Sequence, residues 1–209
     1  MRIESFGLEG QFVRLEPLGL HHVDALLAAA RVDPSLYQWT AVAQDRAGMQ
    51  AYVETALSWQ EAGTAMPFAI ARRADGAVIG STRFFDVGRL PWPPGHPMRE
   101  RKTLDVCEIG YTWLTRDAIR TAANSEAKLL MLTHAFETWR MLRVCLHTDE
   151  RNARSRAAME RMGARFEGIL RVHRVAVDGL PRNSARFSIV AEEWPAARAR
   201  LAGMMQRYA

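Results

Sequence analysis

The order of the sequence elements changes midway along the chain, and this change limits the folds that the chain can adopt. In the first half, two apolar segments flank Asp75-Gly76, a dipeptide typical of tight hairpins, which predicts local antiparallel pairing. In the second half, the segments 103–114, 125–140 and 142–149 read as strand, helix and strand. Such a crossover usually places its two strands parallel and side by side. The sequence therefore predicts an α/β (α+β) fold, with antiparallel strands around one parallel pair.

Apolar periodicity places the other elements. Apolar residues three or four apart indicate helices, and strict alternation indicates strands. The predicted helices span 21–31, 46–63, 125–140 and 152–163. The predicted strands span 12–18, 66–73, 77–87, 103–114, 142–149, 164–177 and 183–190. Four prolines between residues 89 and 102 predict a loop without regular structure.

The composition is that of one globular domain. The chain has 209 residues, of which 48% are hydrophobic and 24% charged, which suffices for one well-buried core but is short for two. We therefore expect a single domain over residues 1–209. No segment approaches the roughly 18 apolar residues that span a bilayer, and the N-terminus lacks the apolar core of a signal peptide. A cytoplasmic location without membrane association is expected.

The net charge limits the classes of ligand that the protein can bind, and the positions of the two cysteines indicate their oxidation state. The formal charge of +5 favours an anionic ligand, an acidic partner or nucleic acid, although arginines scattered over solvated faces give the same charge. The six tryptophans are dispersed and form no stacking array, so direct nucleic-acid binding is not expected. Cys107 and Cys145 lie in apolar segments, which suits reduced thiols, although a single disulfide stays open. No metal site emerges from the spacing of the histidines.

The start of the helix after the strand 103–114 is a candidate anion site. An apolar stripe from Leu129 to Trp139 predicts a helix with one buried face, capped by Asn124 or Ser125. A helix start leaves its first backbone N–H groups unpaired and carries a partial positive charge. Anions bind at such positions in many folds, so this turn is a candidate site for a phosphate.

Four segments carry a resemblance to a known family: EIGYTWL, NSEAKLLMLTHAFE, TDERNARSRAAMERMGARFEGILR and DGLPRNSARFSI. With the order of the elements, they resemble the GNAT superfamily of acetyl-CoA-dependent N-acetyltransferases, and most closely its ribosomal-protein N-terminal (alanine/serine) acetyltransferase branch. The resemblance covers nearly the whole chain. It implies a mixed sheet of about seven strands with a splayed parallel pair, flanked by about four helices.

The resemblance also implies where acetyl-CoA binds. Its pantetheine arm would lie between the two parallel strands, and its pyrophosphate on the loop that follows the first of them. The implied residues are Trp113, Leu114, Thr115, Ile119, Arg120, Thr121, Ala122, Ala123, Asn124, Ser125, Asn152 and Ser155. The family loop reads R/Q-x-x-G-x-G/A, and this chain departs from it at three positions. Main-chain amides can still bind the pyrophosphate if the loop keeps a left-handed or close-packed conformation. Asn124 is the residue that best tolerates the left-handed region, and a helical Asn124 would weaken the assignment.

Two residues are the catalytic candidates. Many family members protonate the departing thiolate with a tyrosine, but this chain has Met159 there, and the ribosomal-protein branch implies Ser155 instead. Ser155 could equally serve the helix start as a cap. Glu108, a lone carboxylate in an apolar strand, is the leading general base, directly or through a water; pairing with Arg83 or exposure to solvent is the alternative. Tyr111 could join Glu108 only if the strand carries a bulge.

The sequence constrains the acceptor of the acetyl group less than it constrains the binding of acetyl-CoA. A primary amine is implied by the resemblance, with a protein N-terminus favoured over a polyamine, an amino acid or an amino-group antibiotic. A CoA-binding module without turnover is the alternative from another class, and a homodimer is a family-level expectation. The loops 33–45 and 89–102 are expected to shape the acceptor pocket, and His147 either lines it or is structural.

Overall fold

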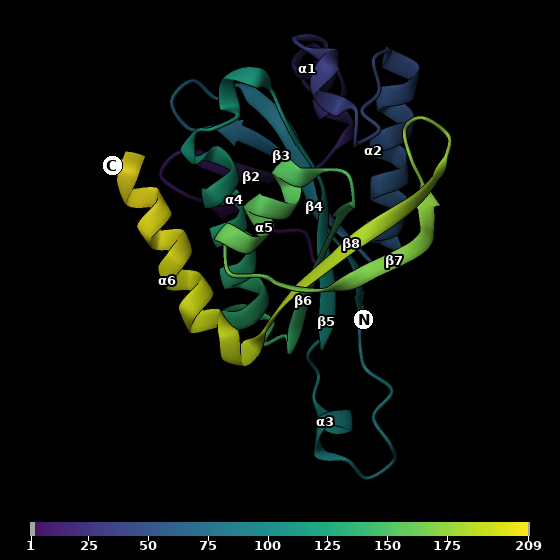
Figure 1. Ribbon diagram of the computed structural model, residues 1–209, viewed down its shortest axis with the longest axis vertical. Helices are drawn as coiled ribbons and strands as arrows, with labels where there is room; N and C mark the ends of the chain where they lie inside the picture. The colour runs from purple at the N-terminus through teal and green to yellow at the C-terminus, as the bar shows by residue number, and fades with distance from the viewer. Residues whose placement is uncertain (1–2, 209) are drawn as a thin grey trace.

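The computed structural model describes residues 3–208 and contains one mixed sheet in the strand order β1-β2-β3-β4-β5-β6-β8-β7 (Figure 1). The strands are β1 (Leu8–Glu9), β2 (Val13–Pro17), β3 (Met66–Arg72), β4 (Val78–Gly88), β5 (Val106–Leu114), β6 (Arg143–Asp149), β7 (Arg165–Val175) and β8 (Pro181–Val190). The helices are α1 (Val23–Arg31), α2 (Arg46–Glu61), α3 (Pro97–Glu100), α4 (Ala122–Thr133), α5 (Ala153–Arg161) and α6 (Trp194–Met205). The mixed α/β sheet with one parallel pair is confirmed.

The structure adds three elements to the predicted set. The two-residue strand β1 pairs with β2 at the sheet edge and is too short for an alternating pattern. Helix α6 covers the basic C-terminal segment. The expectation that 89–102 holds no regular structure is wrong, because Pro97 starts the single turn α3. Proline suits the first position of a helix, where its missing N–H would have no partner.

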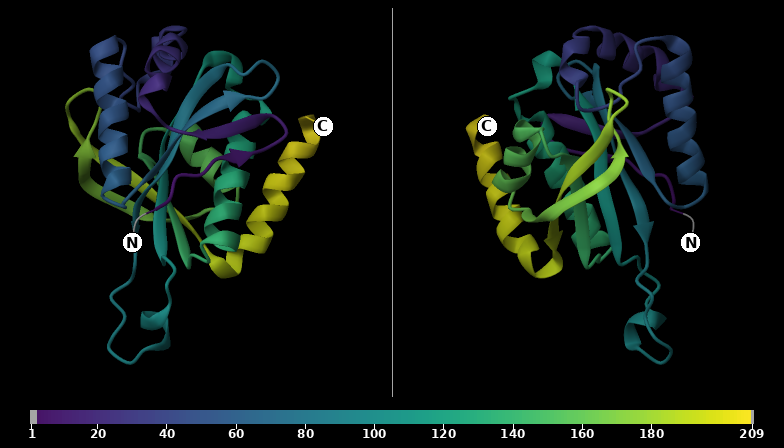
Figure 2. Two further views of the ribbon diagram at one scale, coloured as in Figure 1. Left: turned by 180° about the vertical axis from the view of Figure 1, so that it is seen from behind. Right: turned by 45° about the vertical axis from the view of Figure 1, so that its right-hand side comes forward.

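The helices cover the two faces of the sheet unequally. Helices α1 and α2 lie on one face, and α4, α5 and α6 lie on the other (Figures 1 and 2). Side chains of β5 lie on both faces: Ile109 packs in the core under α4, whereas Trp113 packs with α1 and α2. Polar side chains on the α1/α2 face can therefore be approached only where these two helices leave the sheet uncovered.

The parallel strands β5 and β6 separate partway along their length. Their pairing begins at Val106 with Arg143 and ends at Glu108 with Cys145. Strand β5 continues to Leu114, while β6 continues in pairing with β8 alone. The predicted splay of the parallel pair is confirmed, and the backbone of β5 beyond Glu108 has no strand on its β6 side. Both cysteines of the chain are free and buried, so no disulfide joins the two strands.

Glu126 of α4 holds the N-terminal strands against the other face. Its carboxylate accepts hydrogen bonds at 2.7 Å from the backbone N–H groups of Gln11, Phe12 and Val13. The turn approaches closely because Gly10 has no side chain: a Cβ there would lie 2.3 Å from the Glu126 carboxyl carbon. Three N–H groups thus depend on one buried carboxylate.

Replacing Glu126 by alanine should therefore destabilise the protein. The three donors lose their charged acceptor in a buried setting, so we expect the free energy of unfolding to fall by about 3 kcal/mol. Urea titration measures this change. The matched control is Glu9→Ala, which breaks an exposed ion pair with Arg73 and should cost less than about 1 kcal/mol. If both variants lowered the free energy of unfolding equally, the three hydrogen bonds to Glu126 would have no special role in stability.

Lys128, two residues further along α4, is buried without a carboxylate partner among the described residues. Its Nζ donates to the Thr112 hydroxyl at 2.7 Å and to the Thr82 hydroxyl at 3.4 Å. Burial lowers the pKa of Lys128 from 10.5 to about 7. The unfolded chain therefore binds one more proton than the folded chain between these two pH values.

It follows that the stability of the protein should rise with pH above about 7, where the folded form no longer carries the buried charge. The contribution is about 1.4 kcal/mol per pH unit, up to the pKa of an unfolded lysine. Lys128→Met removes it, so the difference in unfolding free energy between wild type and variant should grow in favour of wild type from pH 7 to pH 9. Urea titrations at pH 6, 7, 8 and 9 measure the difference. A constant difference would contradict the burial of an ionisable amine.

Candidate active site

The loop after β5 and the start of α4 form the first wall of the site. Helix α4 begins at Ala122, three residues earlier than predicted, because the hydroxyl of Thr121 accepts a hydrogen bond from the backbone N–H of Ala123. Asn124 therefore lies in the first helical turn and is not left-handed, so the support that a left-handed Asn124 would give to the loop assignment is lost. The left-handed residue is Arg120, with a φ of 63°. The loop keeps a left-handed residue, but this residue is an arginine, which has a bulky and positively charged side chain.

This loop has the properties that suit a bound anion. Within residues 3–208, the backbone N–H groups of Arg120 and Thr121 donate no hydrogen bond. The α4 start adds further unpaired N–H groups and a partial positive charge. Ala122 and Ala123 in the first turn are buried and small. The free donors and the positive charge fit a phosphate, and the assignment of residues 119–125 to acetyl-CoA stays a prediction.

Polar contacts hold this loop to the body of the protein. Asp117 accepts a hydrogen bond from the Thr115 hydroxyl at 2.6 Å and forms an ion pair with Arg72 of β3. These two contacts, the hydrogen bond foremost, lower the pKa of Asp117. Arg116 pairs with Asp33, which lies in the segment between α1 and α2. The loop is thereby tied both to the sheet and to the helices on the α1/α2 face.

The last residues of β5 can meet a ligand only through their backbone. The side chains of Trp113 and Leu114 are buried, and the Trp113 ring packs edge-on against Tyr37. The Thr115 N–H is already used, since it donates to the carbonyl of Ile79 at 2.8 Å. Main-chain contacts by Trp113, Leu114 and Thr115 remain a prediction, which for Thr115 is limited to the carbonyl.

Asn152 and Ser155 lie at the start of α5. Because β5 and β6 are parallel, α4 and α5 both begin at the same edge of the sheet. The Asn152 side-chain oxygen accepts a hydrogen bond from the Ser155 N–H at 3.0 Å, so Asn152 is the N-cap. Ser155 does not cap the helix with its hydroxyl. In the described chain neither this hydroxyl nor the Asn152 amide nitrogen has a protein partner, and both residues are half-buried.

Glu108 lies where β5 and β6 separate, and its partner is a histidine. Its Oε2 lies 2.6 Å from Nδ1 of His147 on β6, and each side chain is 7% exposed. The predicted alternative, a pair with Arg83, does not form. The His147 ring in turn lies 5.1 Å from that of His173 on β7. The pKa of His173 is lowered, mainly by burial and then by the nearby charge of Arg174. A carboxylate and two imidazoles thus line the inner end of the gap.

A bulge in β5 brings Tyr111 to the same face as Glu108. The register with β4 shifts between Ser81 and Arg83, and Tyr111 is left-handed with a φ of 52°. The Tyr111 ring lies over the Arg83 guanidinium at 4.2 Å, and its hydroxyl accepts a hydrogen bond from Arg174 at 3.4 Å. The condition that the sequence set for Tyr111 is therefore met.

A cavity of about 740 Å³ opens on the α1/α2 face beside these residues. Its walls come from the segment after α1, from α2, from β4 and β5, and from the turn between β7 and β8. The lining residues include Val42, Tyr52, Trp59, Arg83, Tyr111 and Val177. Sequence reasoning gave none of the α2 residues a role, because Tyr52 and Trp59 resemble ordinary helix side chains. Arg83 carried a signal, since it interrupts an apolar strand.

Of the two loops expected to shape the acceptor pocket, only one does so. Residues 34–44 line the cavity. The proline-rich loop 89–102 contributes none of its lining and projects away from the sheet below β5 in Figure 1. Its base is held by Asp105, which accepts hydrogen bonds from the backbone N–H of Leu90 and from the Trp92 indole.

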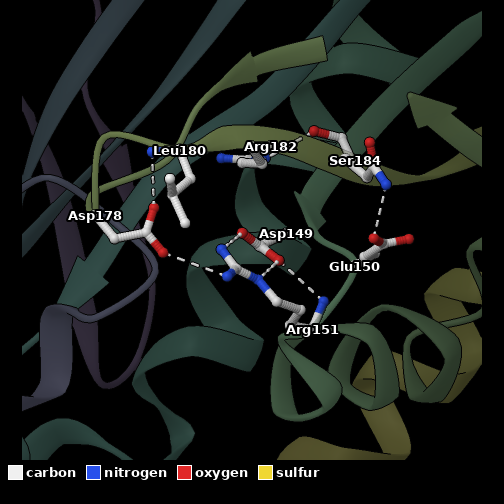
Figure 3. Close-up of polar contacts among 8 residues, drawn as sticks. Asp149, Glu150, Arg151, Asp178, Leu180, Arg182 and Ser184 are labelled. Atoms are coloured by element: carbon white, nitrogen blue, oxygen red, sulfur yellow. Dashed lines mark hydrogen bonds and ion pairs between the residues drawn. The ribbon is translucent and has the colours of Figure 1, made fainter. Parts of the chain in front are cut away.

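Arg151 contacts residues of three segments: the end of β6, the β7–β8 turn and the segment after α1. Figure 3 shows the first two of these contacts. Arg151 donates two side-chain hydrogen bonds to Asp149 at the end of β6 and one to Asp178 in the β7–β8 turn. The hydrogen bonds from Arg151 are the main cause of the lowered pKa of Asp149. The guanidinium also lies 4.8 Å from the ring centre of Trp39, in the segment after α1. The residues that precede Asn152 are thus fixed to the wall of the cavity.

Within residues 3–208, no helix is long and apolar enough to cross a membrane. The same residues contain no group of three or more histidine, cysteine, aspartate or glutamate side chains placed to hold a metal ion.

Solved structures share this fold over most of the chain. A GCN5-related N-acetyltransferase from Brucella melitensis is 29% identical, with a TM-score of 0.80 over 97% of this chain and 86% of that one. RimJ from Mycobacterium smegmatis, solved in complex with CoA-disulfide, is 21% identical, with a TM-score of 0.77 over 95% and 94%. An enzyme from Salmonella typhimurium that modifies the N-terminal serine of ribosomal protein L7/L12 is 16% identical, with a TM-score of 0.72 over 88% and 99%.

A family model agrees with the structural likeness. A search of curated proteins found no match. The model of the acetyltransferase (GNAT) domain, however, matches residues 13–165, which is more than half of the chain and spans β2 to the start of β7. On this match, the chain belongs to the GNAT family of acetyltransferases.

Proposed function

We propose that the chain, as one domain over residues 1–209, transfers the acetyl group of acetyl-CoA to a primary amine, with a protein N-terminus as the favoured acceptor. Two fold neighbours support the finer part of this proposal. RimJ was solved with a CoA derivative, and the Salmonella enzyme modifies a ribosomal-protein N-terminus. Both are distant in sequence, so the acceptor is proposed from the likeness of fold together with the open cavity.

The observation that carries the proposal is the separation of β5 from β6 after Glu108. It creates a backbone edge that can hydrogen-bond an amide-containing arm, with the donor-rich start of α4 at one end. Glu108 stands at the other end, on the face that holds the cavity. Acetyl-CoA and the acceptor amine can therefore reach one point from two sides of the sheet.

The family's cosubstrate supplies an acetyl group activated as a thioester. The residues that would hold it are the β5 backbone from Trp113 to Thr115, the loop 119–125 and Asn152. Glu108 would accept the proton that the attacking amine loses, at Oε1 or Oε2, directly or through one water. His147 lies beside this carboxylate, with its Nδ1 atom 2.6 Å from Oε2. The Ser155 hydroxyl, which has no hydrogen-bond partner in the described part of the chain, would donate a proton to the sulfur as it departs.

Two observations favour a second candidate, a CoA-binding module without turnover. The loop contains no glycine, and its left-handed position is occupied by Arg120. In addition, Met159 stands where many family members have a tyrosine and is buried in the core, so it offers no proton. Stabilisation by acetyl-CoA without release of free thiol, across a panel of amines, would favour this candidate.

The two catalytic assignments can be tested by matched substitutions. Glu108→Gln and Ser155→Ala should each lower kcat by about 10²-fold or more, since general acid–base catalysis contributes about that much, while acetyl-CoA affinity stays near the wild-type value. Thiol release and calorimetry measure the two quantities. Glu54→Gln, on the exposed side of α2, is the control and should leave both unchanged. A variant that turns over at the wild-type rate would remove its residue from the mechanism.

The loop assignment predicts a different signature for Arg120→Gly. Glycine adopts the left-handed region without a Cβ penalty, so the free energy of unfolding should rise by about 1 kcal/mol. The lost cation should weaken acetyl-CoA binding and flatten its dependence on salt. Arg140→Gly is the control, because Arg140 is also left-handed, with a φ of 55°, but lies at the far end of α4. It should gain stability with unchanged affinity; equal affinity in both variants would contradict the loop assignment.

A further inference from the structure

Arg83 is a buried cation without an anionic partner in the described chain. It is 1% exposed, and its Nε and Nη2 atoms have no hydrogen-bond partner among residues 3–208. Three aromatic rings surround the guanidinium, with centres at 4.2 Å for Tyr111, 4.7 Å for Tyr52 and 5.4 Å for Trp59. All four side chains line the cavity on the α1/α2 face.

The aromatic rings offset only part of the cost of this burial. An arginine stays charged in proteins, and burying an unpaired charge costs several kcal/mol. A ring face returns about 2 kcal/mol when desolvated, but it accepts no regular hydrogen bond from the guanidinium N–H groups. The planar fork of donors is therefore free for a planar anion, and a carboxylate matches it with two parallel hydrogen bonds.

Arg83 stands at a defined place relative to Glu108. In the antiparallel register, Arg83 lies opposite Gly110 and Phe85 lies opposite Glu108, so the two charged residues are diagonal neighbours on one face. Such neighbours are about 7–8 Å apart. The Phe85 ring leans over Gly110, where a Cβ would lie 2.8 Å from it, and so separates the two charges. This explains why Arg83 and Glu108 do not pair.

We propose that Arg83 binds a carboxylate of the acceptor, so that the enzyme selects amines that also carry a carboxylate group. The inference rests on the proposed acetyl transfer and names the acceptor class of that site. An acceptor with its amine at Glu108 and a carboxylate at Arg83 spans the diagonal between them. The remaining walls are mostly apolar, with Val42 and Val177 among them, and suit the carbon chain between the two polar groups. The carboxylate belongs either to a free amino acid or to an acidic side chain next to a peptide N-terminus.

Pairs of acceptors that differ only in this group test the proposal. The peptide pair is Ala-Glu-Ala-amide against Ala-Gln-Ala-amide, and the amino-acid pair is alanine against alaninamide. In the wild type, kcat/KM should favour the carboxylate by about 100-fold in one of the pairs, and that pair identifies the source of the carboxylate. In Arg83→Met the preference should fall to near 1, while acetyl-CoA affinity is kept.

Two further variants make the result specific to Arg83. Arg83→Lys keeps the charge but loses the fork, so it should retain only part of the preference. Arg46→Met removes an exposed arginine at the start of α2 and should retain all of it. Arg83→Met should melt no lower than the wild type, because it removes an unpaired buried charge, so a loss of preference cannot be ascribed to unfolding.

Binding of the same compounds, measured by calorimetry, separates this inference from the proposed function. If the wild type binds carboxylates better than amides through Arg83 but acetylates neither, the acceptor site stands and the acetyl transfer fails. If the wild type acetylates both members of each pair equally well, the enzyme stands and the role of Arg83 is overturned. A preference that survives in Arg83→Met overturns it as well.

Discussion

The end of the pairing between β5 and β6 at Glu108 is the constraint on which the rest of the structure depends. Backbone N–H and C=O groups at a strand edge need partners, and a sheet that separates leaves them available along one side of β5. The two helices that follow the separating strands begin at the same edge, where their unpaired donors gather. One irregularity of the sheet thereby supplies a backbone edge, two helix starts and an opening to the opposite face.

The two faces of the sheet have different roles, one mainly in stability and the other in ligand recognition. The face under α4 and α6 carries the larger core and the tie from Glu126 to the N-terminal strands. The α1/α2 face is less completely filled, and its polar side chains from β4 and β5 line a cavity. Strand alternation accounts for this division, because Ile109 and Glu108 point to opposite faces. The core can therefore remain closed while the other face accepts a ligand.

The sequence was sufficient for the order of the elements but not for the conformations inside the site. The strand–helix–strand pattern predicted the mixed sheet, and all seven predicted strands are present. The left-handed residue of the loop proved to be Arg120 and not Asn124, because Thr121 caps the helix before Asn124 is reached. The bulge at Tyr111 and the aromatic surroundings of Arg83 depend on which strands and helices meet, so no local pattern could place them.

Residues 149–152 form a short segment between the end of β6 and the start of α5. Arg151 ties this segment to Trp39 and Asp178 on the side of the cavity, and the next residue, Asn152, begins the helix on the side of the gap. The two sides of the site therefore share one connection rather than being two independent walls. A shift of this segment would change the positions of residues on both sides, so the fit of one substrate is linked to the fit of the other.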